Sequence, residues 1–376
     1  MIDSIASLSL GRYDLNLCEA LKSNKENYIE LVVPRNYKFI ANSLKISRIG
    51  NHMDKAKNKY LRTYSYICFL INIYKIVDNT YSCLHWQMGF ICLFDKLFIK
   101  LLKHKVKKLK TVLTIHDIKP MKNTLNNIFF RRSFMKGFDG YVLHSKENIK
   151  EFKEYLKKKN ALYKIIPHGP IEKKEYVALN NIGSDIAGLP TTSCLILTLG
   201  TINRSKNIEQ CLEIIRKIKK KYIQVFYVIA GYGDPKYSAK IKSLLKEFNE
   251  ISYVSFINRE LNDDEVAYLH QRACFSLYIY NRCTTSGAII TSLCSGVPVL
   301  GNDLPGMRAL IIDGYNGFII KRSNSDKKIL ELIRAITDKD AYERIKANSM
   351  HLSDQISWKE IATEHNKLYK ELVAVQ

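Results

Sequence analysis

Short apolar runs alternate with amphipathic stretches along most of this chain, which predicts parallel β-strands joined by crossover helices. In the first half, the runs that predict strands are residues 4–10, 29–34, 81–86, 111–117, 140–145 and 163–169. We expect a turn at Gly11–Tyr13, directly after the first of these runs, and a helix from Leu15 onward.

The second half repeats the alternation. Its predicted strands are residues 194–200, 225–233, 252–257, 274–280 and 297–303. Its predicted helices are residues 207–221, 235–249, 263–272 and 286–295, followed by a last helix at about 357–373. Residues 172–192 have weak periodicity, two glycines and a proline, so we interpret them as the connection between two domains.

The length of 376 residues is enough for two hydrophobic cores. We therefore predict an α/β protein with two Rossmann-like, doubly wound domains facing a central cleft. The first comprises residues 1–175 with a C-terminal helix at about 357–376, and the second comprises residues 193–356. Ligands of such sheets bind beyond the carboxyl ends of the strands, so the turns after the strands are the candidate sites.

The turn after residues 194–200 carries two cations. It begins at Gly200 and reads GTINRSKN, with Arg204 and Lys206 shortly before the next helix. A helix N-terminus offers N–H donors and a partial positive charge, and two added cations make this position suitable for a diphosphate. The alternative is an ordinary loop of a basic protein.

Hydroxyl side chains and small residues precede a later helix. In this segment, Thr284, Thr285 and Ser286 can cap the helix, while Gly287 and Ala288 leave room for a ligand near the backbone. The segment could cradle an anion, and simple N-capping explains it equally well.

His116 ends the predicted strand at residues 111–117. At a strand exit, an imidazole can bond a substrate hydroxyl or take part in acid–base chemistry. A single histidine is more often satisfied by its neighbours, so both interpretations stay open. His85 and His168 also lie at the ends of predicted strands, with less context.

The net charge of +23 is concentrated in residues 96–164, which hold 19 Lys or Arg against 5 Asp or Glu. Compositional drift, an anionic membrane or lipid-linked substrate, and nucleic acid are the three explanations, although no nucleic-acid reader module is present. Residues 88–110 place apolar residues at helical spacing beside many lysines. Such a helix could lie on an anionic membrane, or it could pack one face against the core and expose its lysines to water on the other.

No apolar run is long enough to cross a bilayer, and the N-terminus lacks the pattern of a signal peptide. The nine cysteines include no C-x-x-C pair, which favours reduced thiols over a disulfide framework or a zinc site. We therefore expect a cytoplasmic protein, peripheral at the inner face of the cell membrane.

The order of these segments resembles family 4 of the retaining glycosyltransferases, which have the GT-B fold. The similar segments of the second half are LTLGTINRSKNIEQCLEII, FYVIAGYGD, VSFINRELNDDEVAYLHQRACFSLYIY and TTSGAIITSLCSGVPVLGNDLPGMRALIIDGYNGFII. Those of the first half are VLTIHDIKP, YVLHSKENIKEF and KIIPHGP, and ISWKEIATEHNKLYKELV resembles the last helix of the family. The similarity covers most of the chain from about Ser82 onward.

The resemblance implies that the donor is a UDP- or GDP-sugar and that no cofactor or bound metal is required. Lys206, with Arg204, would bind the donor diphosphate, and the backbone of residues 285–288 would cradle its phosphates or the sugar. These cations and the helix N-terminus would stabilise the leaving diphosphate.

The resemblance also assigns residues around the sugar and the base. His116 would be the catalytic residue beside the transferred sugar. Gly11 and Gly200 would let the sugar-phosphate approach closely, and Ile257 and Asn258 would contact the base through their backbone.

Three positions depart from the family. Cys283 and Thr291 stand where the family usually has two glutamates, and Thr201 stands where it has the first basic residue of the diphosphate pair. The form without glutamates resembles a subgroup of bacterial surface-polysaccharide transferases. We therefore expect a retaining, hexosyltransferase-type enzyme with a glycan or lipid-diphosphate-linked acceptor. The alternative is a catalytically silent GT-B subunit that binds a partner transferase at the membrane.

Overall fold

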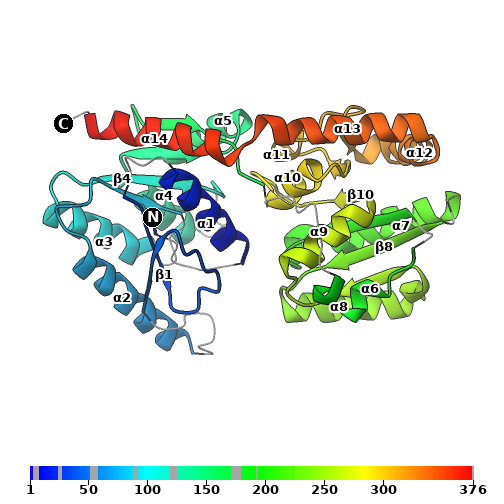
Figure 1. Cartoon of the computed structure of the whole chain (residues 1–376), viewed down its shortest axis with the longest axis horizontal. Coiled ribbons are helices and arrows are strands. Elements are labelled where there is room, and N and C mark those ends of the chain that lie inside the picture. The colour runs from blue at the N-terminus through cyan, green and yellow to red at the C-terminus, as the bar shows by residue number, and fades with distance from the viewer. Residues whose placement is uncertain are drawn as a thin grey trace. The chain divides into compact units, whose positions relative to one another are not determined.

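The computed structural model describes residues 1–2, 8–23, 28–50, 58–87, 92–118, 125–170, 179–191, 194–222 and 224–374 (Figure 1). The chain divides into two units, which are Met1–Gly169 with Ile356–Gln376, and Pro170–Gln355. Each unit is a parallel β-sheet covered by helices, as the alternating pattern predicted.

The second unit holds six parallel strands in the order β12-β11-β10-β7-β8-β9. The strands are β7 (Cys194–Leu199), β8 (Val225–Ala230), β9 (Val254–Ile257), β10 (Ala273–Tyr278), β11 (Val299–Asn302) and β12 (Gly317–Ile320). The α-helices that follow β7 are α7 (Ile208–Lys221), α8 (Pro235–Glu247), α9 (Asp263–Arg272), α10 (Gly287–Cys294), α11 (Pro305–Arg308), α12 (Ser325–Thr337) and α13 (Lys339–Gln355). This is the strand order of a Rossmann fold, and it reverses between β7 and β10.

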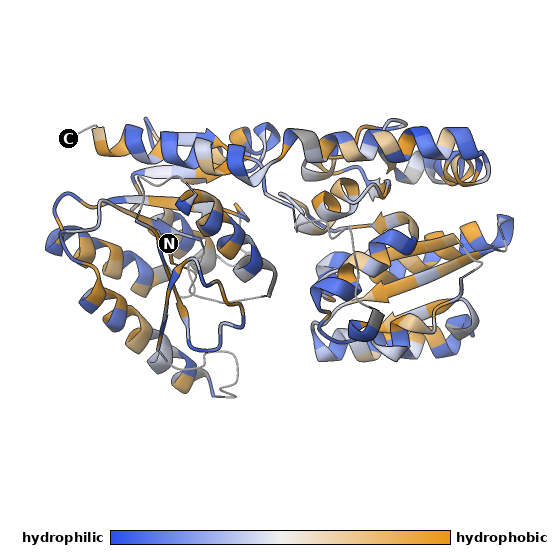
Figure 2. Cartoon of the chain, viewed as in Figure 1, coloured by the Kyte–Doolittle hydropathy of each residue, from blue (hydrophilic) through white to orange (hydrophobic). Residues whose placement is uncertain are grey.

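Local sequence explains why these elements form. All six residues of β7 are buried, and Figure 2 shows the strands of this unit as nearly continuous hydrophobic segments, as expected for strands covered on both faces. Helix α8 begins with a capping Asp234 followed by Pro235, and α9 begins with a capping box between Asn262 and Glu265.

The predicted connection at residues 172–192 is wrong where the structure describes it. Its last part forms η2 (Leu179–Asn181) and α6 (Ser184–Ala187), and both belong to the second unit. Arg259 joins this part to α9, since its guanidinium bonds both Asp185 and Glu265. Ile186 and Leu189 are buried there, but two apolar residues are too few to show a helical period in the sequence.

The turn after β8 packs tightly against the turn after β7. A Cβ on Gly231 would lie 1.9 Å from the carbonyl oxygen of Gly200, and one on Gly233 would lie 1.9 Å from that of Ile202. Ile202 also donates its N–H to the carbonyl of Tyr232. The Gly-x-Gly sequence is therefore needed for two backbones to meet.

The first unit contains two groups of parallel strands. The sheet β3-β4-β5-β6 consists of β3 (Cys83–Trp86), β4 (Lys110–Ile115), β5 (Gly140–Leu143) and β6 (Leu162–Ile165). The pair β1-β2 consists of β1 (Glu30–Pro34) and β2 (Lys45–Ile49). Ile2 bridges Val32 on one side and Trp86 on the other, so the N-terminal backbone joins the two groups.

The helices of this unit are α1 (Leu8–Lys22), α2 (Lys59–Ile76), α3 (Cys92–Lys105), α4 (Leu125–Met135), α5 (Ile149–Leu156) and α14 (Trp358–Ala374). None of the helices in the described ranges is long and apolar enough to cross a membrane.

The predicted strand at residues 4–10 and the turn at Gly11–Tyr13 are wrong for the residues that the structure describes. Residues 8–13 belong to α1, and strand-like pairing occurs instead at Met1 and Ile2, while residues 3–7 lie outside the described ranges. Gly11 faces Tyr37, whose hydroxyl donates to the Gly11 carbonyl over 2.8 Å. A Cβ on Gly11 would lie 2.9 Å from the Tyr37 ring, so packing inside the unit accounts for this glycine.

Five histidines lie in the interior of the first unit and one in the second. Those of the first unit are His85, His116, His144, His168 and His365, and the one in the second is His270. Burial lowers the pKa of each imidazole, to about 3 for His144 and to about 4 for His365 and His270. These side chains are therefore neutral at pH 7.

Gly231→Ala is expected to lower the free energy of unfolding by about 2–4 kcal/mol, because the new methyl group would overlap the Gly200 carbonyl. Gly314→Ala is the matched control in the same unit. Gly314 also has a positive φ, of +77°, but no atom lies within 4 Å of its Cβ position, so a loss of about 1 kcal/mol is expected. Urea unfolding followed by circular dichroism measures both, and equal losses would contradict the backbone contact.

Acidification from pH 7.5 to 5.5 is expected to destabilise the first unit more than the second. The unfolded chain binds protons on histidine below pH 6.5, whereas the folded chain does not. Each buried histidine therefore lowers the free energy of unfolding by about 1.4 kcal/mol for every pH unit below that value. His85, His144 and His365 are buried in the first unit, against His270 in the second, and the half-buried His116 and His168 of the first unit add to the difference. We therefore expect the free energy of unfolding to fall by at least about 4 kcal/mol in the first unit and by about 1.4 kcal/mol in the second by pH 5.5.

The two tryptophans make this measurement specific, because Trp86 and Trp358 both lie in the first unit. Tryptophan fluorescence then follows the first unit, while far-ultraviolet circular dichroism follows both. Carboxylates titrate below this pH window and do not interfere. A fluorescence transition at the same urea concentration at both pH values would show that the buried histidines do not control acid stability.

Candidate active site

The turns after β7 and β10 lie where the strand order of the second unit reverses. The first turn contains the short helix η3 (Arg204–Lys206) and ends at Asn207, whose left-handed backbone (φ 46°) starts α7. The second turn leads from β10 to α10. Ligands of open parallel sheets bind at such a reversal, so the structure places the predicted cationic turn and the predicted hydroxyl-rich turn together at the expected position.

Asn281 ties the two turns to each other. Its backbone N–H donates to the carbonyl oxygen of Ser205 over 3.0 Å, and its side-chain amide donates to that of Arg204 over 2.9 Å. The turn that begins at Asn281 is one of the predicted turns after strands, but the sequence does not reveal what this side chain bonds. Its two bonds fix the backbone of η3 relative to the start of the second turn.

A buried tyrosine joins the cation to the helix start. The Lys206 ammonium lies 3.8 Å from the centroid of the Tyr280 ring, and the Tyr280 hydroxyl lies 3.2 Å from Ser286 Oγ. Ser286 in turn caps α10 by accepting the N–H of Ile289. Lys206 and the N-terminus of α10 therefore share one edge of the sheet, where both favour negative charge.

Gly200 and Ala288 complete this edge. Gly200 has φ +133°, and the nearest atom to a Cβ built there is the Cβ of Ala288, 3.9 Å away. Gly200 therefore faces the first turn of α10, whose leading N–H groups have no partners within the helix. Thr285, Gly287 and Ala288 are half-buried, which leaves part of each accessible.

Two of the three positions that depart from the resembled family are buried in this unit. Cys283 and Thr291 are 9% and 3% exposed, whereas Thr201 is exposed. The turn that holds Cys283 packs against Gly306 of α11, because a Cβ on Gly306 would lie 2.5 Å from the Cys283 carbonyl oxygen. Hydroxyl groups and backbone, rather than carboxylates, therefore line this turn.

Ile257 and Asn258 lie at the end of β9, two strands away from β7. The Ile257 carbonyl accepts the N–H of Gly231 over 2.9 Å, and the Asn258 side chain accepts the Ser238 hydroxyl over 3.2 Å. These bonds fix the turn after β9 at the same edge of the sheet. Whether it contacts a base stays a prediction.

A second cluster of polar groups lies at the carboxyl edge of the sheet in the first unit. His116, His144 and His168 follow the adjacent strands β4, β5 and β6. His144 Nε2 lies 3.3 Å from His116 Nδ1, and His116 Nε2 lies 3.1 Å from the side-chain oxygen of Gln87, which follows β3. His116 and, with less context, His168 were noted from the sequence, whereas Gln87 and His144 were not.

Helices α1 and α14 cover this cluster within the first unit. Tyr13 of α1 packs edge-on against His116, with ring centroids 5.5 Å apart, and also against His168 and Trp358. The alignment of parallel strands could have identified the cluster, because residues directly after adjacent strands meet at one edge. Gly11 lies two residues before Tyr13 on α1, and its predicted role toward a sugar-phosphate stays a prediction.

No group of three His, Cys, Asp or Glu side chains within the described ranges is arranged to hold a metal ion. The eight cysteines whose side chains the structure describes are free thiols.

Residues 183–351 match the family model of the glycosyl transferases group 1. Over 328 residues, the chain is 24% identical to an uncharacterized glycosyltransferase, MJ1178, of Methanocaldococcus jannaschii, covering 83% of each protein.

Two solved structures are similar over nearly the whole chain. Sucrose-phosphate synthase from Thermosynechococcus elongatus superimposes with a TM-score of 0.77 at 15% identity, covering 97% of this chain and 93% of that one. HepE of Anabaena, in complex with UDP and glucose, gives a TM-score of 0.71 at 12% identity and covers 98% of both chains. The comparisons therefore support a glycosyltransferase with a group 1 domain at residues 183–351 and the GT-B fold.

Proposed function

We propose that this chain is a retaining glycosyltransferase that uses a nucleoside-diphosphate sugar and no bound metal. One observation carries the proposal: Lys206 and the Ser286-capped start of α10 are joined through Tyr280 where the strand order reverses. A similar structure, HepE, was determined with UDP and glucose, which supports a nucleotide sugar as the donor.

The chemistry follows from where negative charge develops. As the bond between the anomeric carbon and the diphosphate breaks, charge grows on the diphosphate oxygens. Lys206, with Arg204, and the N–H groups at the start of α10 would stabilise that charge. The acceptor hydroxyl attacks from the face that the diphosphate leaves and gives its proton to a diphosphate oxygen, which retains the configuration of the sugar.

The remaining assignments extend this proposal to the sugar and the base. Thr285 and Ser286, with the backbone of Gly287, take the place of the glutamates that the family uses. His116 contacts the transferred sugar, Gly11 and Gly200 allow the sugar-phosphate to approach, and the turn after β9 contacts the base.

For the acceptor, we propose a glycan or lipid-diphosphate-linked sugar at an anionic membrane surface, in bacterial surface polysaccharide synthesis. The support comes from α3, whose inner face carries buried Phe98 and Leu102. Its outer face exposes Leu93, Leu97 and Leu101, which are 53%, 56% and 48% accessible and recur every four residues. A helix face that only contacts water is usually polar, so a row of exposed leucines indicates contact with a membrane.

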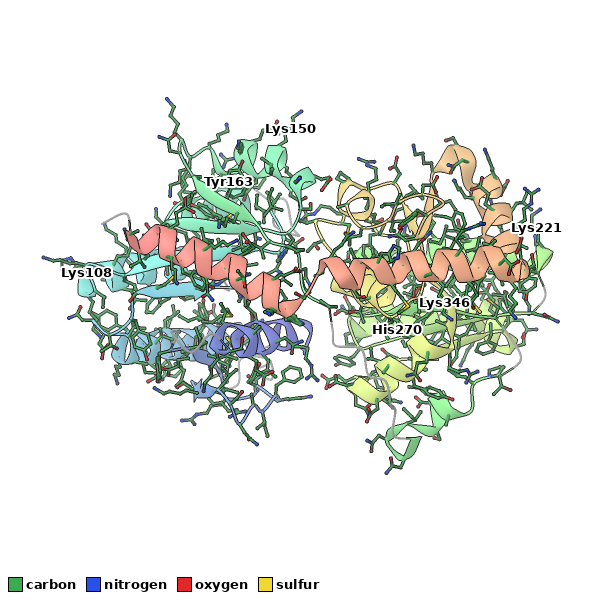
Figure 3. The ribbon with its side chains drawn as sticks, turned by 45° about the horizontal axis from the view of Figure 1, so that its top comes forward. Lys108, Lys150, Tyr163, Lys221, His270 and Lys346 are labelled. Atoms are coloured by element: carbon green, nitrogen blue, oxygen red, sulfur yellow. The ribbon has the colours of Figure 1, made fainter. Side chains whose placement is uncertain are left out.

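Lysines accompany the leucine row. Lys96 and Lys100 are exposed on the same helix, and Lys108 and Lys150 extend outward elsewhere on the first unit (Figure 3). Cations beside leucines match an anionic headgroup layer above hydrocarbon, since each basic residue near such a surface contributes about 1 kcal/mol.

Lys206→Ala is expected to weaken binding of the donor at least about tenfold, because a charge-assisted hydrogen bond contributes about 1.5–3 kcal/mol. A panel of UDP- and GDP-sugars is tested for an increase in melting temperature. A ligand at a hundred times its dissociation constant stabilises the folded chain by about 2.7 kcal/mol.

Lys242→Ala is the control, since Lys242 is an exposed lysine on α8 of the same unit. It should keep the ligand-induced shift of the wild type. Full binding and turnover by Lys206→Ala would remove the residue on which the proposal depends. If no nucleotide sugar shifts the wild type, the chain is not a transferase of this kind.

Leu97→Gln with Leu101→Gln is expected to weaken binding to vesicles that contain phosphatidylglycerol about thirtyfold to several hundredfold, since each buried leucine contributes about 1–2 kcal/mol. Cosedimentation measures the bound fraction. Leu330→Gln is the control, because Leu330 is an exposed leucine of α12 in the second unit. Equal binding by the double variant and the wild type, or equal binding to neutral vesicles, would contradict this surface.

A further inference from the structure

We propose that His144 and Gln87 are positioning residues that hold His116 in one tautomer, with its proton on Nδ1 and a lone pair on Nε2. His116 can then accept a hydrogen bond from a hydroxyl of the bound sugar and cannot donate one. The inference rests on the proposed function for the identity of the ligand, but the tautomer itself depends only on contacts inside the first unit.

A backbone carbonyl determines the tautomer of His144. His144 Nδ1 lies 3.0 Å from the carbonyl oxygen of Ile166. A carbonyl oxygen can only accept, so this nitrogen must carry the proton. A neutral imidazole has one proton, and His144 Nε2 therefore presents a lone pair.

The next contact transfers this restriction to His116. His144 Nε2 lies 3.3 Å from His116 Nδ1. Two lone pairs would repel at this distance, so His116 Nδ1 must donate its proton to His144. His116 Nε2 is then left with a lone pair, and the orientation of one backbone carbonyl has determined the tautomers of two rings.

Gln87 meets the lone pair of His116. One end of its side-chain amide lies 3.1 Å from His116 Nε2, and the other end lies 3.1 Å from the sulfur of Met1. The two ends of an amide have nearly the same shape, so hydrogen bonding decides their assignment. A lone pair requires a donor, and we therefore assign the NH₂ end of Gln87 to His116.

A charged His116 would also satisfy both contacts, because an imidazolium donates from both nitrogens. The surroundings disfavour it. Burial lowers the pKa of His116, and the neighbouring His144 and His168 lower it further. The neutral tautomer is therefore the one present at pH 7.

A sugar hydroxyl can take the place of the Gln87 amide. His116 is half-buried, whereas Gln87 is 1% exposed. With its NH₂ end on His116, the other end of the Gln87 amide is an oxygen that faces the Met1 sulfur and receives no hydrogen bond from it. A hydroxyl that donates to Nε2 would replace an amide N–H with an O–H on the same lone pair. The site would then select sugars with a hydroxyl at that position.

The test is ¹⁵N NMR of the full chain with labelled histidine, since a protonated and an unprotonated imidazole nitrogen have well-separated chemical shifts. The His116 signals are identified as those that disappear in His116→Gln. In the substrate-free wild type at pH 7, we expect Nδ1 to be protonated and Nε2 unprotonated. A proton on His116 Nε2 would overturn the proposal.

Three variants separate positioning from simple packing. His144→Phe keeps a ring without an acceptor, and His116 should then lose its Nδ1 proton preference, whereas His144→Gln keeps an acceptor and should preserve it. Gln87→Glu replaces the donor with a carboxylate, which can only accept, so His116 should become protonated on both nitrogens at pH 7. An unchanged His116 tautomer in folded His144→Phe, or a still neutral His116 in Gln87→Glu, would also overturn it.

Activity provides a separate measurement with the nucleotide sugar that raises the melting temperature. His144→Phe and Gln87→Glu should lower kcat at least about tenfold, His144→Gln should restore most of it, and donor affinity should change little. If no nucleotide sugar is turned over, the proposed function fails while the NMR result still decides the tautomer. If turnover is normal in a variant with the altered tautomer, the inference fails and the proposed function stands.

Discussion

The two hydrogen bonds of Asn281 are the interaction on which the arrangement of the candidate donor site depends. They join the end of β10 to η3, two segments more than seventy residues apart in sequence that become neighbours only because the strand order reverses between β7 and β10. Without this link, η3, which carries Lys206 over the Tyr280 ring, would lose its attachment to the turn after β10.

Two glycines also fix the position of the cationic turn after β7. Gly231 and Gly233 let the turn after β8 press against the turn after β7, so the cationic turn is held from both neighbouring strands. A turn fixed in this way places a charge before a ligand arrives, and a preorganised charge stabilises a developing negative charge more than one that must first reorient. The backbone contacts therefore matter to chemistry although no glycine touches a reacting atom.

Much of this fold follows from the sequence, because strands covered on both faces must be apolar runs and their helices must be amphipathic. The bounds of α9 were predicted to the residue, and Asn262 with Glu265 explains why. The N-terminal strand could not be predicted in the same way. Pairing at Met1 and Ile2 involves too few residues to show alternation, and Gly11 suggested a turn where the structure uses it for packing against Tyr37.

The candidate sites divide along the same line. Lys206, Ser286 and His116 could be found from sequence, because each stands beside a recognisable strand end. Gln87 and His144 stand at the ends of predicted strands, so the alignment of those strands could have placed them beside His116. Asn281 could not be found, since its importance lies in bonds to a turn that only the sheet brings near. The same edge geometry yields opposite environments: cations and helix N–H groups in the second unit, and neutral, buried imidazoles in the first. A cationic edge suits a diphosphate, and an edge of neutral imidazoles suits hydroxyl groups.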